Sequence, residues 1–78
     1  MSGREEIFVR LLDEAVEVWR PVQARSTGPD RYLILEQPYD REIERWEFEP
    51  GAEVTCALVP ADGGEILAAV KAPGPGVA

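Results

Sequence analysis

Acidic and aromatic side chains are the residues of this chain whose types and spacing could support chemistry. Three carboxylates fall within residues 13–17 and three more within residues 40–44, and aromatic residues lie near both segments. Aromatic rings pack on a proline-containing peptide in the polyproline conformation, while carboxylates pair with its Arg or Lys side chains. The candidate binding residues are Asp13, Glu14, Glu17, Trp19, Tyr39, Asp40, Glu42 and Trp46.

The same rings are also candidates for a hydrophobic core. A small domain needs its largest side chains inside, and this applies to Phe48 and Trp46 more than to the other rings. Trp19 fits either role. Tyr39 lies in a polar segment, so we expect it to be exposed.

The sequence lacks most of the residue types and motifs that enzymes use for catalysis. The chain has no His and one Cys. The serines therefore lack an imidazole base, and a zinc site of His and Cys cannot form. Adjacent acids such as Asp13/Glu14 and Glu47/Glu49 lack the spacing of a calcium loop, and no glycine motif for phosphate binding is present. We expect a protein that is not an enzyme and that uses no metal and no cofactor.

Charge narrows the class of partner. Fifteen acidic and eight basic residues give a formal net charge of -7. Proteins that bind nucleic acid or anionic membranes rely on Lys and Arg, so neither is an expected ligand. A basic segment of a protein partner fits this charge. The alternative is an acidic inhibitor that mimics nucleic acid, although a net charge also simply keeps a small domain soluble.

Length predicts a single domain. A chain of 78 residues buries only about 60% of its unfolded surface, and its thin core makes a homodimer or a homo-oligomeric structural subunit a further alternative. We expect residues 6–71 to form the domain. Residues 1–5 are expected to be flexible, and the Pro- and Gly-rich tail 72–78 to be disordered.

The single cysteine indicates the kind of cellular compartment in which the protein is expected. Without a second Cys the chain cannot form an internal disulfide, which fits a reducing environment. Cys56 lies in an apolar alternating run, so we expect a buried, unreactive thiol. No apolar run has signal-peptide or membrane-spanning length, and we expect a cytoplasmic protein.

Residues 7–22 allow two structures. Ser2-Gly3-Arg4-Glu5 matches a capping box and Pro21 a helix end, so an amphipathic helix over 3–20 packed on a small antiparallel sheet is one interpretation. The other has strands over 7–12 and 16–24 joined by a turn at 13–15. β-Branched residues favour these strands, and Pro21 then belongs at an edge or a bulge.

The rest of the chain favours strands. Short apolar runs occupy 31–36, 53–59 and 65–71, and Val54, Cys56 and Leu58 share one face of the middle run. Turn signals separate the runs, including Pro50-Gly51, which suits a type II turn. The pattern predicts an all-β fold of four or five short strands, which form a small barrel or a sandwich. In such a barrel the first loop and the long 37–45 connection, where Asp40 caps a helical turn, flank one groove.

A resemblance agrees with this prediction. The words Val18-Trp19-Arg20-Pro21-Val22 and Trp46-Glu47-Phe48-Glu49-Pro50-Gly51 resemble a family of short, uncharacterised bacterial proteins, and the likeness covers residues 7–71. It implies a five-stranded barrel like that of Src-homology-3 (SH3-like) domains and no established activity. Family members tend to have Gly where this chain has Ala15, which implies a positive φ in the first turn.

Overall fold

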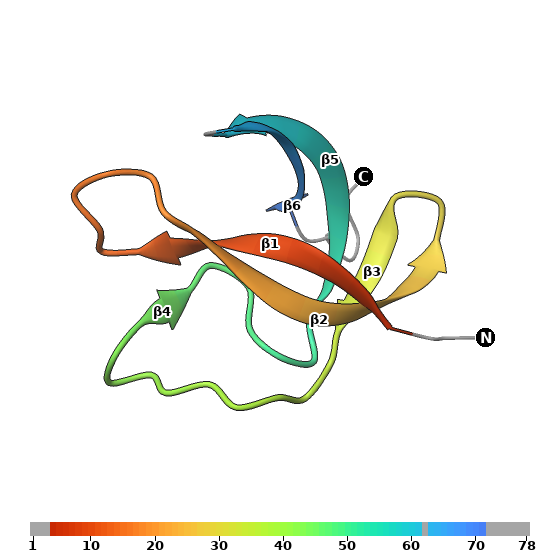
Figure 1. Ribbon diagram of the computed structural model, residues 1–78. Helices are drawn as coiled ribbons and strands as arrows, with labels where there is room; N and C mark the ends of the chain where they lie inside the picture. Colours follow the sequence, from red (N-terminus) through yellow and green to blue (C-terminus); the bar gives the residue numbers. More distant parts are fainter. Residues whose placement is uncertain (1–3, 62, 72–78) are drawn as a thin grey trace, which may run out of the picture.

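The computed structural model describes residues 4–61 and 63–71, and these residues form six strands and no helix (Figure 1). The strands are β1 (Glu5–Leu12), β2 (Trp19–Gly28), β3 (Arg31–Ile34), β4 (Arg45–Trp46), β5 (Glu53–Ala61) and β6 (Gly64–Lys71).

Five of these strands close into a ring. Neighbours pair in the order β1-β2-β3-β5-β6, and β6 returns to β1 through a parallel contact between Ala68 and Phe8. The short β4 pairs with the end of β1 at Leu11 and Leu12. The predicted all-β, five-stranded barrel is confirmed, and the alternative of an N-terminal helix over 3–20 is wrong.

The alternation of buried and outward-facing side chains explains why the opening segment forms strands. Ile7 and Val9 are completely buried and Leu11 nearly so, whereas the residues between them face outward. Every strand contributes to the same interior, because a strand presents alternate side chains to one face. The buried apolar residues are Ile7, Val9, Leu11, Val22, Ala24, Ile34, Trp46, Val54, Cys56, Ala68 and Ala69.

The first hairpin differs in detail from its prediction. The second strand runs from Trp19 to Gly28 rather than over 16–24, and Val16 lies in the loop with 71% of its surface exposed. Asp13 adopts a φ of 64°, whereas Ala15 is not among the described residues with positive φ. The first loop therefore has a positive φ, but at Asp13 and not at Ala15, since the loop is longer than a tight turn. Asp tolerates this conformation better than most residues do.

Pro21 lies at a position of β2 that donates no hydrogen bond to β1. Gln23 directs its N–H and C=O away from β1, because these groups bond to Gln37 Oε1 and to Leu35 N. Pro21 lies two residues earlier and faces the same edge, since backbone groups alternate along a strand. Its missing N–H therefore costs no strand hydrogen bond, and the predicted edge position is confirmed.

Two predicted turns are also confirmed. Ala52 N donates to Glu49 O at 3.0 Å and Gly51 has a φ of 93°, as a type II turn with Pro50 requires. Glu44 N donates to Asp40 O at 3.1 Å, which closes one helical turn in the 37–45 connection. The Asp40 carboxylate accepts the Glu42 N–H at 2.9 Å and caps this turn.

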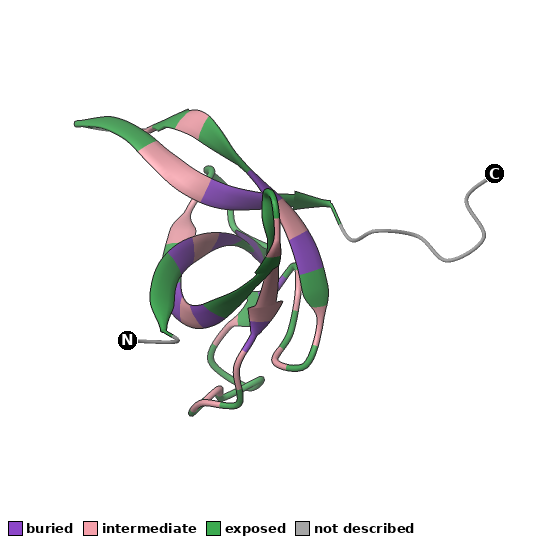
Figure 2. Cartoon of the chain, turned by 90° about the vertical axis from the view of Figure 1, so that its right-hand side faces the viewer, coloured by how far each residue is buried: buried purple, intermediate pink, exposed green. Residues whose placement is uncertain are grey.

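The β5–β6 hairpin extends beyond the barrel. β3 pairs with β5 only at residues 53–55, and β1 meets β6 only at Ala68, so residues 58–61 and 64–67 pair only with each other within the described sheet. Figure 2 shows this outer part of the hairpin leaving the ring, with its residues exposed or half-buried. Leu58 keeps the predicted phase of Val54 and Cys56 but is 63% exposed, because this part of the hairpin extends past the ring and no described strand except β6 pairs with it.

The domain limits agree in part with expectation. β1 starts at Glu5, which pairs with Ala24, and β6 ends at Lys71. The predicted flexible residues 1–3 and the predicted disordered tail 72–78 lie outside the described residues. Within the described part of the chain, no helix could cross a membrane.

Candidate functional site

The first loop and the long connection lie side by side, as predicted. A hollow of about 270 Å³ has Leu12, Asp13 and Glu14 on one wall and residues 41–45 on the other. We call it the acidic-loop hollow. It contains the predicted residues Asp13, Glu14 and Glu42, and the apolar side chains of Leu12 and Ile43 are exposed there.

Arginines interrupt the acidic character of this region. Arg45 Nη1 lies 3.4 Å from Asp13 Oδ2, and Arg41 Nη2 lies 3.2 Å from Glu49 Oε1. Exposed pairs of this kind contribute little to stability, but they offset the negative charge locally. The predicted acidic wall is therefore a mixed one.

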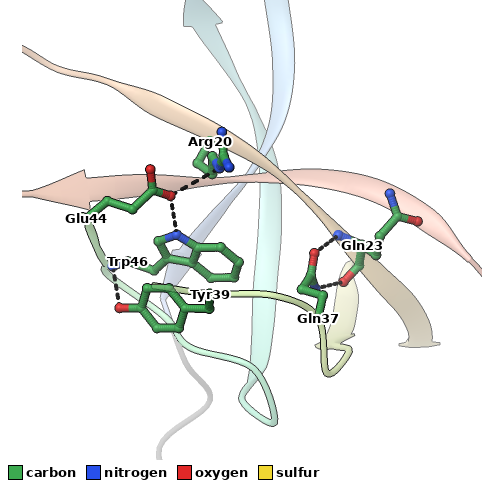
Figure 3. Close-up of polar contacts among 6 residues, drawn as sticks. All are labelled: Arg20, Gln23, Gln37, Tyr39, Glu44 and Trp46. Carbon is green, nitrogen blue, oxygen red and sulfur yellow. Dashed lines mark hydrogen bonds and ion pairs between the residues drawn. The ribbon is translucent and has the colours of Figure 1, made fainter. Parts of the chain in front are cut away.

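Tyr39 and Trp46 form a stacked pair. Their ring centroids are 4.3 Å apart at an interplanar angle of 22°. Trp46 is only 4% exposed and belongs to the core, whereas Tyr39 is half-buried against that core. The expectation of an exposed Tyr39 was wrong, because its ring stacks on Trp46 and its hydroxyl accepts the Trp46 backbone N–H (Figure 3).

Polar contacts fix the two rings from several sides. The Tyr39 hydroxyl accepts the backbone N–H of Trp46 at 2.9 Å and donates to Glu49 Oε2 at 3.1 Å. Glu44 Oε1 accepts the indole N–H of Trp46 at 2.7 Å and lies 3.1 Å from Arg20 Nε (Figure 3). Glu44 is thus engaged within the fold and is a poor candidate for holding a ligand.

Glu49 has the clearest electrostatic perturbation of the exposed carboxylates. Hydrogen bonds from Arg41 and then from Tyr39 lower the pKa of Glu49, because both stabilise its charged form. The same hydrogen bond raises the pKa of Arg41, whose guanidinium lies 4.7 Å from the centre of the Tyr39 ring. These contacts join the long connection to the segment that follows β4.

A larger groove lies on the other side of the first loop. It measures about 720 Å³ and runs between the outer face of the β1–β2 hairpin and the outer part of the β5–β6 hairpin. We call it the hairpin groove. Its lining residues are Phe8, Glu17, Val18, Trp19, Pro60, Ala61 and Ile66.

Strand register explains why apolar residues line the hairpin groove. Phe8 alternates out of phase with the core residues of β1 and pairs with Pro21, while Trp19 pairs with Arg10. Phe8 and Trp19 therefore share the outer face of the hairpin, and both are half-buried. Glu17 makes no ion pair with any residue of 4–61 or 63–71, so its carboxylate is open to a ligand.

Neither protein-family models, nor curated proteins, nor solved structures gave a match to this chain. The candidate site therefore depends on its own geometry.

The predicted binding residues thus divide among separate surfaces. Glu17 and Trp19 lie in the hairpin groove, and Asp13, Glu14 and Glu42 lie in the acidic-loop hollow. Tyr39, Asp40 and Glu42 line a further hollow of about 490 Å³ with Arg20 and Pro38, so Glu42 is shared with the acidic-loop hollow, and Trp46 is in the core.

Sequence reasoning missed five residues of the hairpin groove. They are Phe8, Val18, Pro60, Ala61 and Ile66. The available signal was Phe8, a large aromatic residue on the solvent phase of a strand whose other phase carries Ile7, Val9 and Leu11. The contribution of β5 and β6 had no local signal, because only the closure of the ring brings these strands to β1.

Cys56 is buried, as predicted. Its side chain is 3% exposed, and burial raises the pKa of the thiol to about 11, with the Asp30 carboxylate adding to the effect. A thiol that remains protonated at neutral pH is a weak nucleophile. Among the described residues, no group of three acids, Cys or His is placed to hold a metal ion.

Proposed function

We propose that this protein is a non-enzymatic protein-interaction module that binds a basic, proline-containing segment of a partner in the hairpin groove. The observation that carries the proposal is the combination, in one groove, of two half-buried rings and a carboxylate with no ion-pair partner in the described part of the chain. Phe8 and Trp19 supply the rings, and Glu17 supplies the charge.

The chemistry of the groove matches such a segment. A polyproline helix has no internal hydrogen bonds and is already extended, so little conformational entropy is lost when it packs on aromatic rings. An Arg or Lys beside the prolines can pair with Glu17. The net charge of -7 attracts a basic segment from a distance and raises its association rate.

Backbone pairing is poorly suited to this groove. Pro60 occupies an outward-facing position on the edge of β5, where a pairing strand would need an N–H, so backbone pairing at this edge is limited to Leu58. Recognition by side chains is therefore the mode that suits the groove. This favours a polyproline segment over an added β-strand.

The arrangement of charges ranks the alternative function lower. A nucleic-acid mimic needs a continuous acidic face, whereas Arg20, Arg41 and Arg45 are each paired with an acid near the first loop and the long connection. The proposal also includes a cytoplasmic location, since the single thiol fits a reducing compartment.

The test is a titration of the purified protein with a short synthetic peptide that carries prolines and one Arg, measured by isothermal titration calorimetry so that the readout does not depend on Trp19. We expect Trp19→Ala to weaken binding by more than about 2 kcal/mol and Glu17→Gln by about 1 kcal/mol, with the fold retained. Glu14→Gln is the matched control, because Glu14 lies in the acidic-loop hollow. Equal loss in Glu14→Gln, or binding that ignores both Glu17 and Trp19, contradicts the proposal.

A further inference from the structure

The outer part of the β5–β6 hairpin is an apolar surface that the barrel does not cover. Residues 57–61 carry no charged side chain, and residues 64–67 carry only Glu65. Leu58 is 63% exposed and lies directly across from Leu67. Exposed apolar surface of this kind is a common feature of association sites.

The adjacent strand edge offers one position for backbone pairing. Cys56 N donates to Asp30 O at 2.7 Å, so the edge of β5 that faces β3 is paired up to this residue and is unpaired beyond it within the described sheet. Backbone groups alternate, and the β5–β6 register is regular from Cys56 to Ala61. Leu58 therefore directs its N–H and C=O outward, and Pro60 directs only a C=O outward.

We propose that two copies of this chain form a dimer through Leu58, with the outer edge of β5 in one copy antiparallel to the same edge in the second copy. Leu58 then faces Leu58 across the two-fold axis. The N–H of each donates to the C=O of the other, and their side chains pack together with Leu67 on one face.

The residues on either side of Leu58 limit this pairing to a closed dimer. In the two-fold arrangement Pro60 of one copy faces Cys56 of the other. Pro60 has no N–H, and the Cys56 N–H is already bonded to Asp30 O. The ladder ends after two hydrogen bonds, so the edge does not extend into a longer assembly.

Charge supports a second copy as the occupant. Each copy carries a net charge of -7, so contact through an acidic face is repulsive. The outer hairpin is nearly uncharged and can contact its own copy without that cost. Ile66, which lines the hairpin groove, faces away from Leu67 because successive side chains alternate, so the dimer does not cover Ile66, whereas Pro60 of the groove shares the face of Leu58.

Analytical ultracentrifugation of the full chain over a wide concentration range tests the proposal. We expect the 8.6 kDa monomer to double in mass and the association to strengthen as salt rises, because salt screens the repulsion between copies. Peptide binding in the groove should instead weaken with salt, so failure of the two proposals can be distinguished.

Substitutions locate the interface. Leu58→Lys should weaken dimerisation by roughly a hundredfold, because it places two like charges at the axis. Ile43→Lys is the matched control, since Ile43 is 75% exposed but lies in the acidic-loop hollow. A circular dichroism spectrum establishes that both variants are folded.

A crosslink gives an independent measurement. In a Cys56→Ala background, Leu58→Cys should yield a disulfide-linked dimer on mild oxidation, because paired strand residues lie about 5.5 Å apart at Cα. Ile43→Cys should yield far less. A wild-type chain that stays monomeric at every concentration, equal weakening by Ile43→Lys, or equal crosslinking at both positions overturns the proposal.

Discussion

The side chain of Gln37 takes the place of a strand beside Gln23. Its Oε1 accepts the Gln23 N–H at 2.9 Å, and its Nε2 donates to Gln23 O at 2.9 Å (Figure 3). The same Nε2 donates to Leu35 O at 2.7 Å. One amide thereby satisfies the edge of β2 at the point where β3 has ended, next to Pro21.

Gln37→Ala should therefore destabilise the barrel by about 1–3 kcal/mol, because it leaves partly buried backbone groups without partners. Gln37→Glu is an informative companion, since a carboxylate still accepts the Gln23 N–H but cannot donate to either carbonyl. Urea unfolding measures both. Equal stability of wild type and Gln37→Ala would contradict this role.

Glu49 should give the protein an acid-sensitive contact. Its pKa is lowered in the folded state, so its contribution to stability is present above the pKa of the unfolded chain and is lost as pH falls through the folded pKa. NMR titration of the Glu49 carboxyl should show a midpoint below that of an ordinary Glu. Arg41→Gln should raise this midpoint, and Tyr39→Phe should raise it less. An unchanged midpoint in Arg41→Gln would refute the assigned cause.

Cys56 should resist alkylation until the protein unfolds. The folded pKa is raised from 9.0 to about 11, so the stabilisation is complete below about pH 9 and is lost as pH rises toward 11. Reaction with iodoacetamide at neutral pH should follow the opening rate, and urea should accelerate it. Cys56→Ala should abolish the reaction, and rapid labelling of the native chain would show that the thiol is accessible.

In the first loop, glycine should leave stability unchanged at position 13 and lower it at position 15. Asp13 has a φ of 64°, so Asp13→Gly should be close to neutral, whereas Asp13→Val should cost about 1–2 kcal/mol. Ala15 is not strained, so Ala15→Gly should lower stability by a few tenths of a kcal/mol through the entropy of the unfolded chain. Thermal unfolding of the three variants tests this, and a stabilising Ala15→Gly would run against the observed loop.

Local pattern was enough to predict most of the fold. The alternation of Ile7, Val9 and Leu11, the Pro50-Gly51 turn and the cap at Asp40 each depend on residues close in sequence. Each was confirmed because the physical cause is itself local: side-chain phase, a positive φ, or a short hydrogen bond. The burial of Cys56 followed from the same phase.

The candidate site depended on contacts distant in sequence, and there prediction was weaker. The chain order places Tyr39 in a polar segment, yet stacking on Trp46 partly buries it. The phase of Leu58 indicates an inward residue, yet the hairpin extends past the barrel and exposes it. Neither outcome can be read from neighbouring residues, because each depends on how far another strand extends.

The sequence by itself determined that this chain forms short alternating strands around an apolar interior and carries an acidic surface with no His and a single thiol. Only the tertiary structure decided which acids and rings share a surface. Closure of the ring brings Ile66 and Pro60 against Phe8 and Trp19, while the strand ends leave Asp13 and Glu14 on another side. Which side chains of a strand point inward is set by the residues nearest in sequence. How the last strand aligns with the first to close the ring is set by the packing of the whole core.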